Sequence, residues 1–175
     1  MKSFSSHRTA APAVFAILVF AAAASPLRAA AWKRLGPFGG FVAAIAVDPT
    51  NPKIIYTGVD AIDVFKSVDG GGHWRKTGLV QSVAYTRLAV DPRNPKTVFA
   101  ATYGGLFVTR NGGESWAAAN TGLTDSYLCT VVLDPSQANV VYVGAMGGVF
   151  KSIDGGRTWK KVSGGIAGKT VMAPT

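Results

Sequence analysis

The stretch Ser152–Trp159, SIDGGRTW, decides the fold of this 175-residue chain, because two further copies of it precede it. They are Ser67–Trp74 (SVDGGGHW) and Thr109–Trp116 (TRNGGESW). Each copy has a hydroxyl residue, then Asp or Asn two positions later, then two glycines and a closing tryptophan. The tryptophans stand 42 and 43 residues apart. A fixed internal period of this length is typical of repeat folds.

Two other markers follow the same period. An Asp-Pro turn recurs at Asp48, Asp91 and Asp134, and an aromatic residue follows each aspartate after eight positions. A phenylalanine then precedes each glycine turn, at positions 65, 107 and 150. Three markers in one phase indicate three copies of one structural unit, and we expect the phenylalanines to be buried.

Each unit holds four short runs rich in Val, Ile, Phe, Tyr and Trp, which predicts four strands. In the first unit these are residues 42–47, 54–59, 63–68 and 73–78. The connections are too short for a parallel return, so neighbouring strands must be antiparallel. Four-stranded meanders stacked radially form a β-propeller, and the Gly-His and Trp-Asp signature of WD repeats is absent. We therefore expect an all-β propeller with three complete blades, at about 42–78, 85–122 and 127–164.

The repeated motif has a local physical logic. Its Asp or Asn can accept hydrogen bonds from backbone N–H groups across the turn, and its glycines can adopt positive φ. Its tryptophan can bury the ring while the indole N–H finds an acceptor. The residues that we assign to this structural role are Ser67, Asp69, Gly71, Trp74, Thr109, Asn111, Gly113, Trp116, Ser152, Asp154, Gly156 and Trp159.

The motif resembles the Asp-box, or BNR, repeat of sialidases, sortilin-type receptors, the photosystem II assembly factor and the xyloglucan-cleaving hydrolases. The resemblance extends over residues 32–175; the third copy matches fully, the second departs at Asn111 and Ser115, and the first at His73. It implies that the box lies at the outer corner of a blade, away from the ligand face. The box Asp and Asn residues are therefore interpreted as structural and not catalytic.

The two ends of the repeat region look like parts of other blades. Residues 32–36 match the last strand of a unit, since Trp32 stands 42 residues before Trp74, and residues 166–175 resemble a first strand. We therefore expect an incomplete ring. Either the chain is a piece of a longer protein, which we favour, or copies of it assemble to close the ring.

Residues 1–31 have the features of a secretory signal. Lys2 and Arg8 precede a twelve-residue apolar run at 13–24, and small residues follow at 29–31. The run is short for a bilayer-spanning helix, so cleavage is expected, with an uncleaved anchor as the alternative. Cleavage lowers the formal charge from +9 to +6. We expect a periplasmic or extracellular protein that meets no nucleic acid and contacts a membrane only through this segment.

Little in the remaining sequence indicates catalysis. His73 is the one histidine after the signal, and neither a zinc-ligand set nor a phosphate-binding loop is present, so we expect no metal and no cofactor. A carboxylate pair is the remaining enzymatic device. The xyloglucan-cleaving relatives imply an acid in the loop that holds Asp60 and Asp63, which makes both candidates. We prefer to read them as residues of a solvated turn. The Arg-Ile-Pro signature of sialidases is absent before Ser67.

Pairs of basic residues follow three of the four tryptophans. Equivalent positions on outer strands would form a basic rim that attracts an anionic partner. The other interpretation, which we prefer, is that these charges prevent edge strands from pairing with other chains. The residues are Lys33, Arg34, Arg75, Lys76, Lys160 and Lys161.

Taken together, these features predict an exported, non-catalytic propeller that serves as a scaffold or binding module for a protein or glycan. The alternative is a fragment of a carbohydrate-active glycoside hydrolase that uses Asp60.

Overall fold

The computed structural model describes residues 35–37, 40–60, 62–79 and 86–162. The chain divides into two compact units, residues 1–33 and 34–175, and every described residue belongs to the second. The expected signal at 1–31, most of the strand expected at 32–36, the strand expected at 166–175, and Lys33 and Arg34 lie outside the described residues. Within the described ranges, no helix is long and apolar enough to cross a bilayer.

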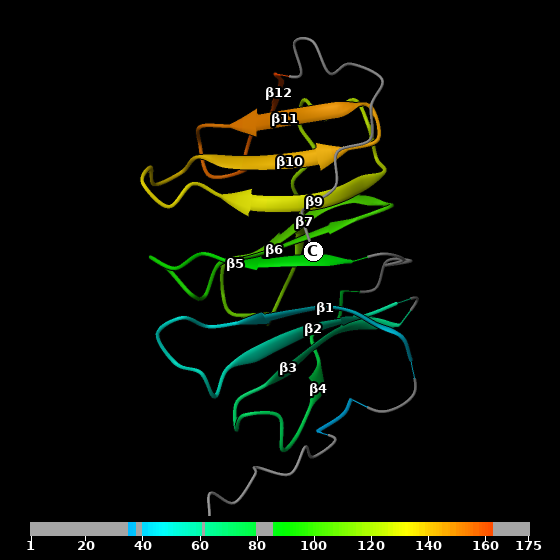
Figure 1. The fold of residues 1–175 in the computed structure, drawn as a ribbon, viewed down its shortest axis with the longest axis vertical. Coiled ribbons are helices and arrows are strands. Elements are labelled where there is room, and N and C mark those ends of the chain that lie inside the picture. Colours follow the sequence, from blue (N-terminus) through cyan, green and yellow to red (C-terminus); the bar gives the residue numbers. More distant parts are fainter. Residues whose placement is uncertain (1–34, 38–39, 61, 80–85, 163–175) are drawn as a thin grey trace, which may run out of the picture. The chain divides into compact units, whose positions relative to one another are not determined.

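The described residues form twelve strands in three antiparallel sheets of four, and each sheet follows chain order (Figure 1). We call the sheets blades 1, 2 and 3. Blade 1 contains β1 (Val42–Val47), β2 (Ile55–Val59), β3 (Asp63–Ser67) and β4 (Arg75–Lys76). Blade 2 contains β5 (Arg87–Val90), β6 (Val98–Thr102), β7 (Gly105–Thr109) and β8 (Ala117–Ala118). Blade 3 contains β9 (Leu128–Leu133), β10 (Val141–Ala145), β11 (Gly148–Ser152) and β12 (Lys160–Lys161).

The predicted all-β fold with three four-stranded meanders is confirmed, and these three sheets do not close into a ring. The fourth strand of each blade is shorter than the sequence suggests. In blade 1 it spans two residues instead of 73–78. The box turn takes up the residues before Arg75, and Gly78 leaves the extended region with a φ of 74°.

Two apolar clusters join the blades. One lies between blades 1 and 2 and includes Tyr56, Val64 and Phe107; the other lies between blades 2 and 3 and includes Phe99 and Phe150. Strands β6 and β7 are buried along their whole length, as expected for a sheet that is covered on both faces.

The outer faces of blades 1 and 3 are less covered. Phe65 is half-buried, unlike its equivalents Phe107 and Phe150, because it lies on the face of blade 1 opposite Val64, and no described blade covers that face. On β1, Ile45 is 66% exposed, and on β9, Val132 is 51% exposed. Among the described residues, blade 2 is therefore the one with a neighbour on each face.

Candidate functional site

Each of the three boxes contains the same pattern of local hydrogen bonds. In blade 3, the Ser152 hydroxyl donates to Asp154 Oδ1 at 2.7 Å and accepts from the Gly156 N–H at 2.9 Å. Asp154 Oδ1 also accepts from the backbone N–H groups of Arg157 and Thr158, both at 2.9 Å. The hydrogen bonds from the Thr158 hydroxyl and backbone and from Ser152 hold the pKa of Asp154 well below its usual range. The carboxylate is committed to the turn.

The box tryptophans link each blade to the segment before it. The indole N–H of Trp159 donates to the Ala119 carbonyl at 2.8 Å, and that of Trp116 donates to the Thr77 hydroxyl at 3.0 Å. Trp74 donates to the Leu35 carbonyl at 2.8 Å. Leu35, Thr77 and Ala119 each follow an in-phase tryptophan by three residues. Leu35 thus occupies the place of a preceding blade's outer segment, although residues 35–37 form no strand.

Asp63 lies inside blade 1 and is 4% exposed. Its Oδ1 accepts a hydrogen bond from the Leu79 N–H at 3.1 Å. Asp60 is half-buried, and its backbone N–H donates to the Phe41 carbonyl at 2.9 Å. The Asp63 carboxylate therefore accepts a backbone hydrogen bond that ties β3 to the segment after β4. We expected both aspartates to lie in a solvated turn, and Asp63 is instead buried.

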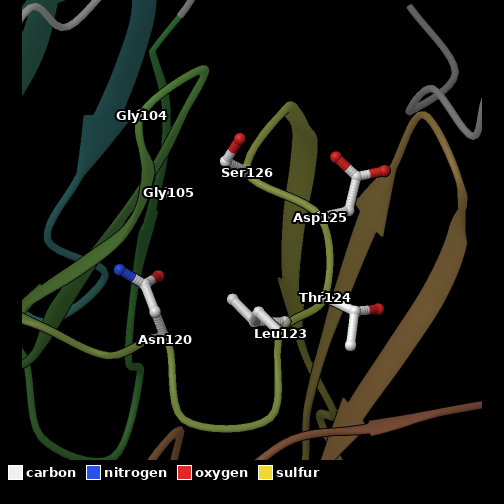
Figure 2. A pocket seen from close by; sticks show the side chains of 7 residues that line it. All are labelled: Gly104, Gly105, Asn120, Leu123, Thr124, Asp125 and Ser126. Carbon is white, nitrogen blue, oxygen red and sulfur yellow. The ribbon is translucent and has the colours of Figure 1, made fainter.

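The end of the molecule that carries the β6–β7 turn also carries a pocket of about 290 Å³. It lies between that turn and the linker from β8 to β9, and sequence analysis did not predict it (Figure 2). In Figure 2, Leu123 points toward the side of the glycine turn, whereas Asp125 lies on the far side of the linker. The lining residues are Gly104, Gly105, Asn120, Leu123, Thr124, Asp125 and Ser126.

Two tyrosines flank this pocket in the chain. The rings of Tyr103 and Tyr127 meet edge to face, with centroids 5.4 Å apart, and Tyr127 is 52% exposed. Tyr103 immediately precedes the glycine turn and Tyr127 immediately follows Ser126. Aromatic residues directly beside predicted turns were the available sequence signal for this site.

Asp125 links the pocket to blade 3. Its Oδ1 accepts from the Tyr127 N–H at 2.9 Å, and its Oδ2 accepts from the Gly147 N–H at 2.7 Å. Both carboxylate oxygens are thus engaged with backbone. Asn120 Oδ1 accepts from the Leu106 N–H at 2.7 Å. The pocket lining is therefore held by backbone hydrogen bonds on two sides, which fixes its form.

Four of the residues expected to form a basic rim are among the described residues. Lys76, Lys160 and Lys161 are exposed on β4 and β12, as is Arg75. The guanidinium of Arg75 forms an ion pair with the Glu114 carboxylate of the next box. In the part of the chain that the structure describes, His, Cys, Asp and Glu form no cluster of three or more that could hold a metal ion.

Comparison with known proteins identifies no matching family model and no matching curated protein. Solved structures do match. An ancestral GH74 enzyme is 29% identical with a TM-score of 0.60, over 71% of this chain and 18% of that one. The GH74 xyloglucanase from Xanthomonas campestris is 20% identical with a TM-score of 0.64, over 73% of this chain and 24% of that one.

Two further matches are to YCF48 and to a chain of a nidogen/laminin complex. YCF48 from Cyanidioschyzon merolae is 16% identical with a TM-score of 0.58, over 75% of this chain and 40% of that one. A chain of a nidogen/laminin complex is 14% identical with a TM-score of 0.56, over 72% of this chain and 49% of that one. The present chain thus spans about a fifth to a half of the structures that it resembles. These matches confirm the predicted resemblance to the β-propellers of xyloglucan-cleaving enzymes and YCF48, and the nidogen match shows the same fold.

Proposed function

We propose that this chain is an exported, non-catalytic propeller module that binds a protein or glycan partner through the face containing the Figure 2 pocket. The observation that carries the proposal is the use of carboxylates at this end of the blades. Asp125 accepts two backbone hydrogen bonds and Asp63 accepts one. A carboxylate that holds a turn together is poorly placed to move protons on a substrate.

The pocket offers mostly neutral groups to a ligand, because the carboxylate of Asp125, its one acidic lining residue, is engaged with backbone N–H groups. Asn120, Thr124 and Ser126 offer neutral hydrogen-bonding groups, and Leu123 and the glycines offer apolar area. Tyr127, which directly follows Ser126, is 52% exposed, and Met146, whose N–H donates to the Tyr127 carbonyl, is 49% exposed. Aromatic side chains with a few neutral polar groups suit the faces of sugar rings and also peptide side chains.

The similar structures support both kinds of partner. GH74 xyloglucanases act on a glycan, YCF48 has been solved bound to D1 peptide, and nidogen in complex with laminin. A titration of the ¹⁵N-labelled chain with a xyloglucan oligosaccharide tests the glycan arm. We expect shifts at Gly104, Gly105 and Ser126 without turnover. Tyr127→Ala should reduce binding about tenfold, whereas Ile153→Ala, at an exposed box position, should not. Binding unaffected by Tyr127→Ala would place the ligand elsewhere.

A glycoside hydrolase fragment is the second candidate, favoured by 29% identity to GH74 enzymes over about 70% of the chain. Asp60 would then be the base or a binding residue. Reducing-end release from xyloglucan oligosaccharides measures this activity. Turnover that Asp60→Asn abolishes and Asp63→Asn retains would overturn the non-catalytic proposal.

Export is part of the proposal and has its own test. The full chain, expressed in a bacterial host, should lose residues 1–31 and appear in the periplasm or medium. Intact-mass measurement reads the cleavage position directly. An uncut chain in the membrane fraction would favour the anchor interpretation.

A further inference from the structure

A second concavity, which shares no lining residue with the Figure 2 pocket, lies at the boundary between blades 2 and 3. It has a volume of about 270 Å³ and opens between β8 and the box turn of blade 3. We call it the rim groove. Its lining residues are Val108, Arg110, Ala117, Ala118, Ala119, Thr121, Gly156 and Arg157.

The rim groove exists because two in-phase residues differ between the blade boundaries. Between blades 1 and 2, Arg75 pairs with Glu114 across the boundary. One repeat later these positions hold Ala117 and Arg157. The long side chain is replaced by a methyl group, and the acid is replaced by a cation. At these positions the second boundary therefore has no ion pair, and a groove opens there.

The charged residues that line the rim groove are both arginines. Arg110 donates from Nη2 to the Gly155 carbonyl at 2.8 Å, which holds its guanidinium beside the groove. Within the described ranges, no acidic side chain lines the groove, and neither Arg110 nor Arg157 forms an ion pair with a carboxylate. A guanidinium has several donors in a planar fork that suits a carboxylate. The missing counter-charge points to an acidic ligand.

The strand that borders the groove is an open edge. β8 is the last strand in the order of its sheet. The equivalent edge strands carry Arg75–Lys76 and Lys160–Lys161, and charged residues of this kind discourage pairing with another chain. β8 carries two alanines at these positions. Among the fourth strands of the three described blades, β8 is thus the one without charged residues.

We propose that an extended acidic peptide segment of a partner protein pairs with β8 and places a carboxylate side chain in the rim groove, beside Arg110 and Arg157. Main-chain hydrogen bonds to the edge would give affinity, and the two arginines would select an acid among the alternate side chains. This surface is separate from the pocket of Figure 2 and does not depend on the function proposed for that pocket.

Fluorescence anisotropy with a labelled peptide of alternating valine and glutamate tests the proposal on the full chain. We expect saturable binding that falls at least tenfold when glutamine replaces glutamate, and also when alternate peptide nitrogens are methylated. Arg157→Gln should weaken binding about tenfold. Lys53→Gln removes one charge from an exposed turn of blade 1 and should change binding less than twofold.

Each arm can overturn the proposal. Equal affinity for the N-methylated peptide would exclude strand pairing, and equal loss from Lys53→Gln would reduce the effect to overall charge. Binding of heparin that depends on Arg157, with no binding of the peptide, would assign the groove to an anionic glycan. Near-ultraviolet circular dichroism should be unchanged for Arg157→Gln, because its side chain is exposed and only its backbone contacts Asp154.

Discussion

The third residue of each box performs the same task with two different chemistries. Asp154 accepts from the Thr158 N–H with Oδ1 and from the Thr158 hydroxyl with Oδ2. In blade 2, Asn111 accepts from the Ser115 N–H with Oδ1 and donates from Nδ2 to the Ser115 hydroxyl. The hydroxyl residue at the seventh position can serve as donor or acceptor, which explains why both side chains fit.

The pH dependence of stability should reveal which boxes are ionised. The pKa of Asp154 is lowered in the folded state, chiefly by its bonds from Thr158, so the unfolded chain takes up the proton first as pH falls. The stabilisation is therefore complete above about pH 5 and is lost as pH falls through the folded pKa. We expect Asp154→Asn to flatten the decline in Tm between pH 5 and 3, and Asn111→Asp to steepen it. Equal slopes in all three proteins would contradict this account.

The two box glycines of blade 3 should differ in their tolerance of alanine. Both have positive φ, 72° at Gly155 and 83° at Gly156. A Cβ at Gly156 would lie 2.7 Å from Phe99 Cε1, whereas one at Gly155 would lie 3.4 Å from Asn139 Oδ1. Urea denaturation should show a loss of about 1–2 kcal/mol for Gly155→Ala and about 3 kcal/mol or more for Gly156→Ala. Equal losses would mean that Phe99 moves freely.

At the scale of elements, blades 1 and 2 both use a side-chain hydrogen bond to join the third strand to the segment after the fourth. The side chain comes from the later segment in blade 2 and from the third strand in blade 1. In blade 2, the Asn120 side chain reaches the Leu106 N–H, and Gly105 leaves room for it, since a Cβ there would lie 2.9 Å from the amide. In blade 1 the in-phase residues are Asp63 and Gly78, and the acid on β3 reaches the later segment instead. The turn before Asp63 is one residue longer, and Asp63 is not among the residues with positive φ.

This exchange predicts a structural effect for Asp63. Asp63→Ala would leave the buried Leu79 N–H without its acceptor and should lower the free energy of unfolding by about 1–3 kcal/mol. Asp63→Asn retains an acceptor oxygen and should lose about 1 kcal/mol or less. Thermal and urea denaturation measure both variants. A larger loss for the asparagine variant would show that the charge itself, and not the acceptor, stabilises the blade.

At the scale of the molecule, the contact between two blade faces occurs twice among the described residues, and no described blade lies against the remaining face of blade 1 or of blade 3. Lys66 lies over the Tyr56 ring at 5.4 Å and donates from Nζ to the Gly112 carbonyl of blade 2 at 2.7 Å. Lys151 lies over the Tyr142 ring at 5.3 Å in the same way on blade 3. The repeat thus presents on blade 3 a face that resembles the one blade 1 presents to blade 2.

These uncovered faces should make the purified chain self-associate. Ile45 on β1 and Val132 on β9 are more than half exposed, and neighbouring exposed apolar groups favour association. Light scattering coupled to size-exclusion chromatography should show mass rising with concentration. Ile45→Lys and Val132→Lys should reduce this rise, whereas Ile153→Lys, on a box turn, should not. A mass that is independent of concentration in every variant would contradict the prediction.

The boxes could be predicted from the sequence because each is contained in eight consecutive residues and its hydrogen bonds are local. Their regular spacing then gave the period of the repeat. The fold class followed from them. The pocket was not readable, because Gly104 and Ser126 come together only through the packing of the blades. The partner of Asp63 lies 16 residues away on a segment with no motif. The rim groove could be predicted in part. An alignment of the repeats places Ala117 with Arg75 and Arg157 with Glu114, and so shows that the second boundary cannot form this ion pair.

The tryptophan bonds described above have a consequence for how the molecule comes apart. Each indole reaches back 39 or 40 residues, to the adjacent segment and no farther. Among the described residues, no tryptophan bond therefore joins blade 1 to blade 3. Each described blade is stabilised by contacts with its immediate neighbours, as in a linear repeat array. Unfolding should begin by fraying at either side, and amide protons of β6 and β7 should be the slowest to exchange with solvent.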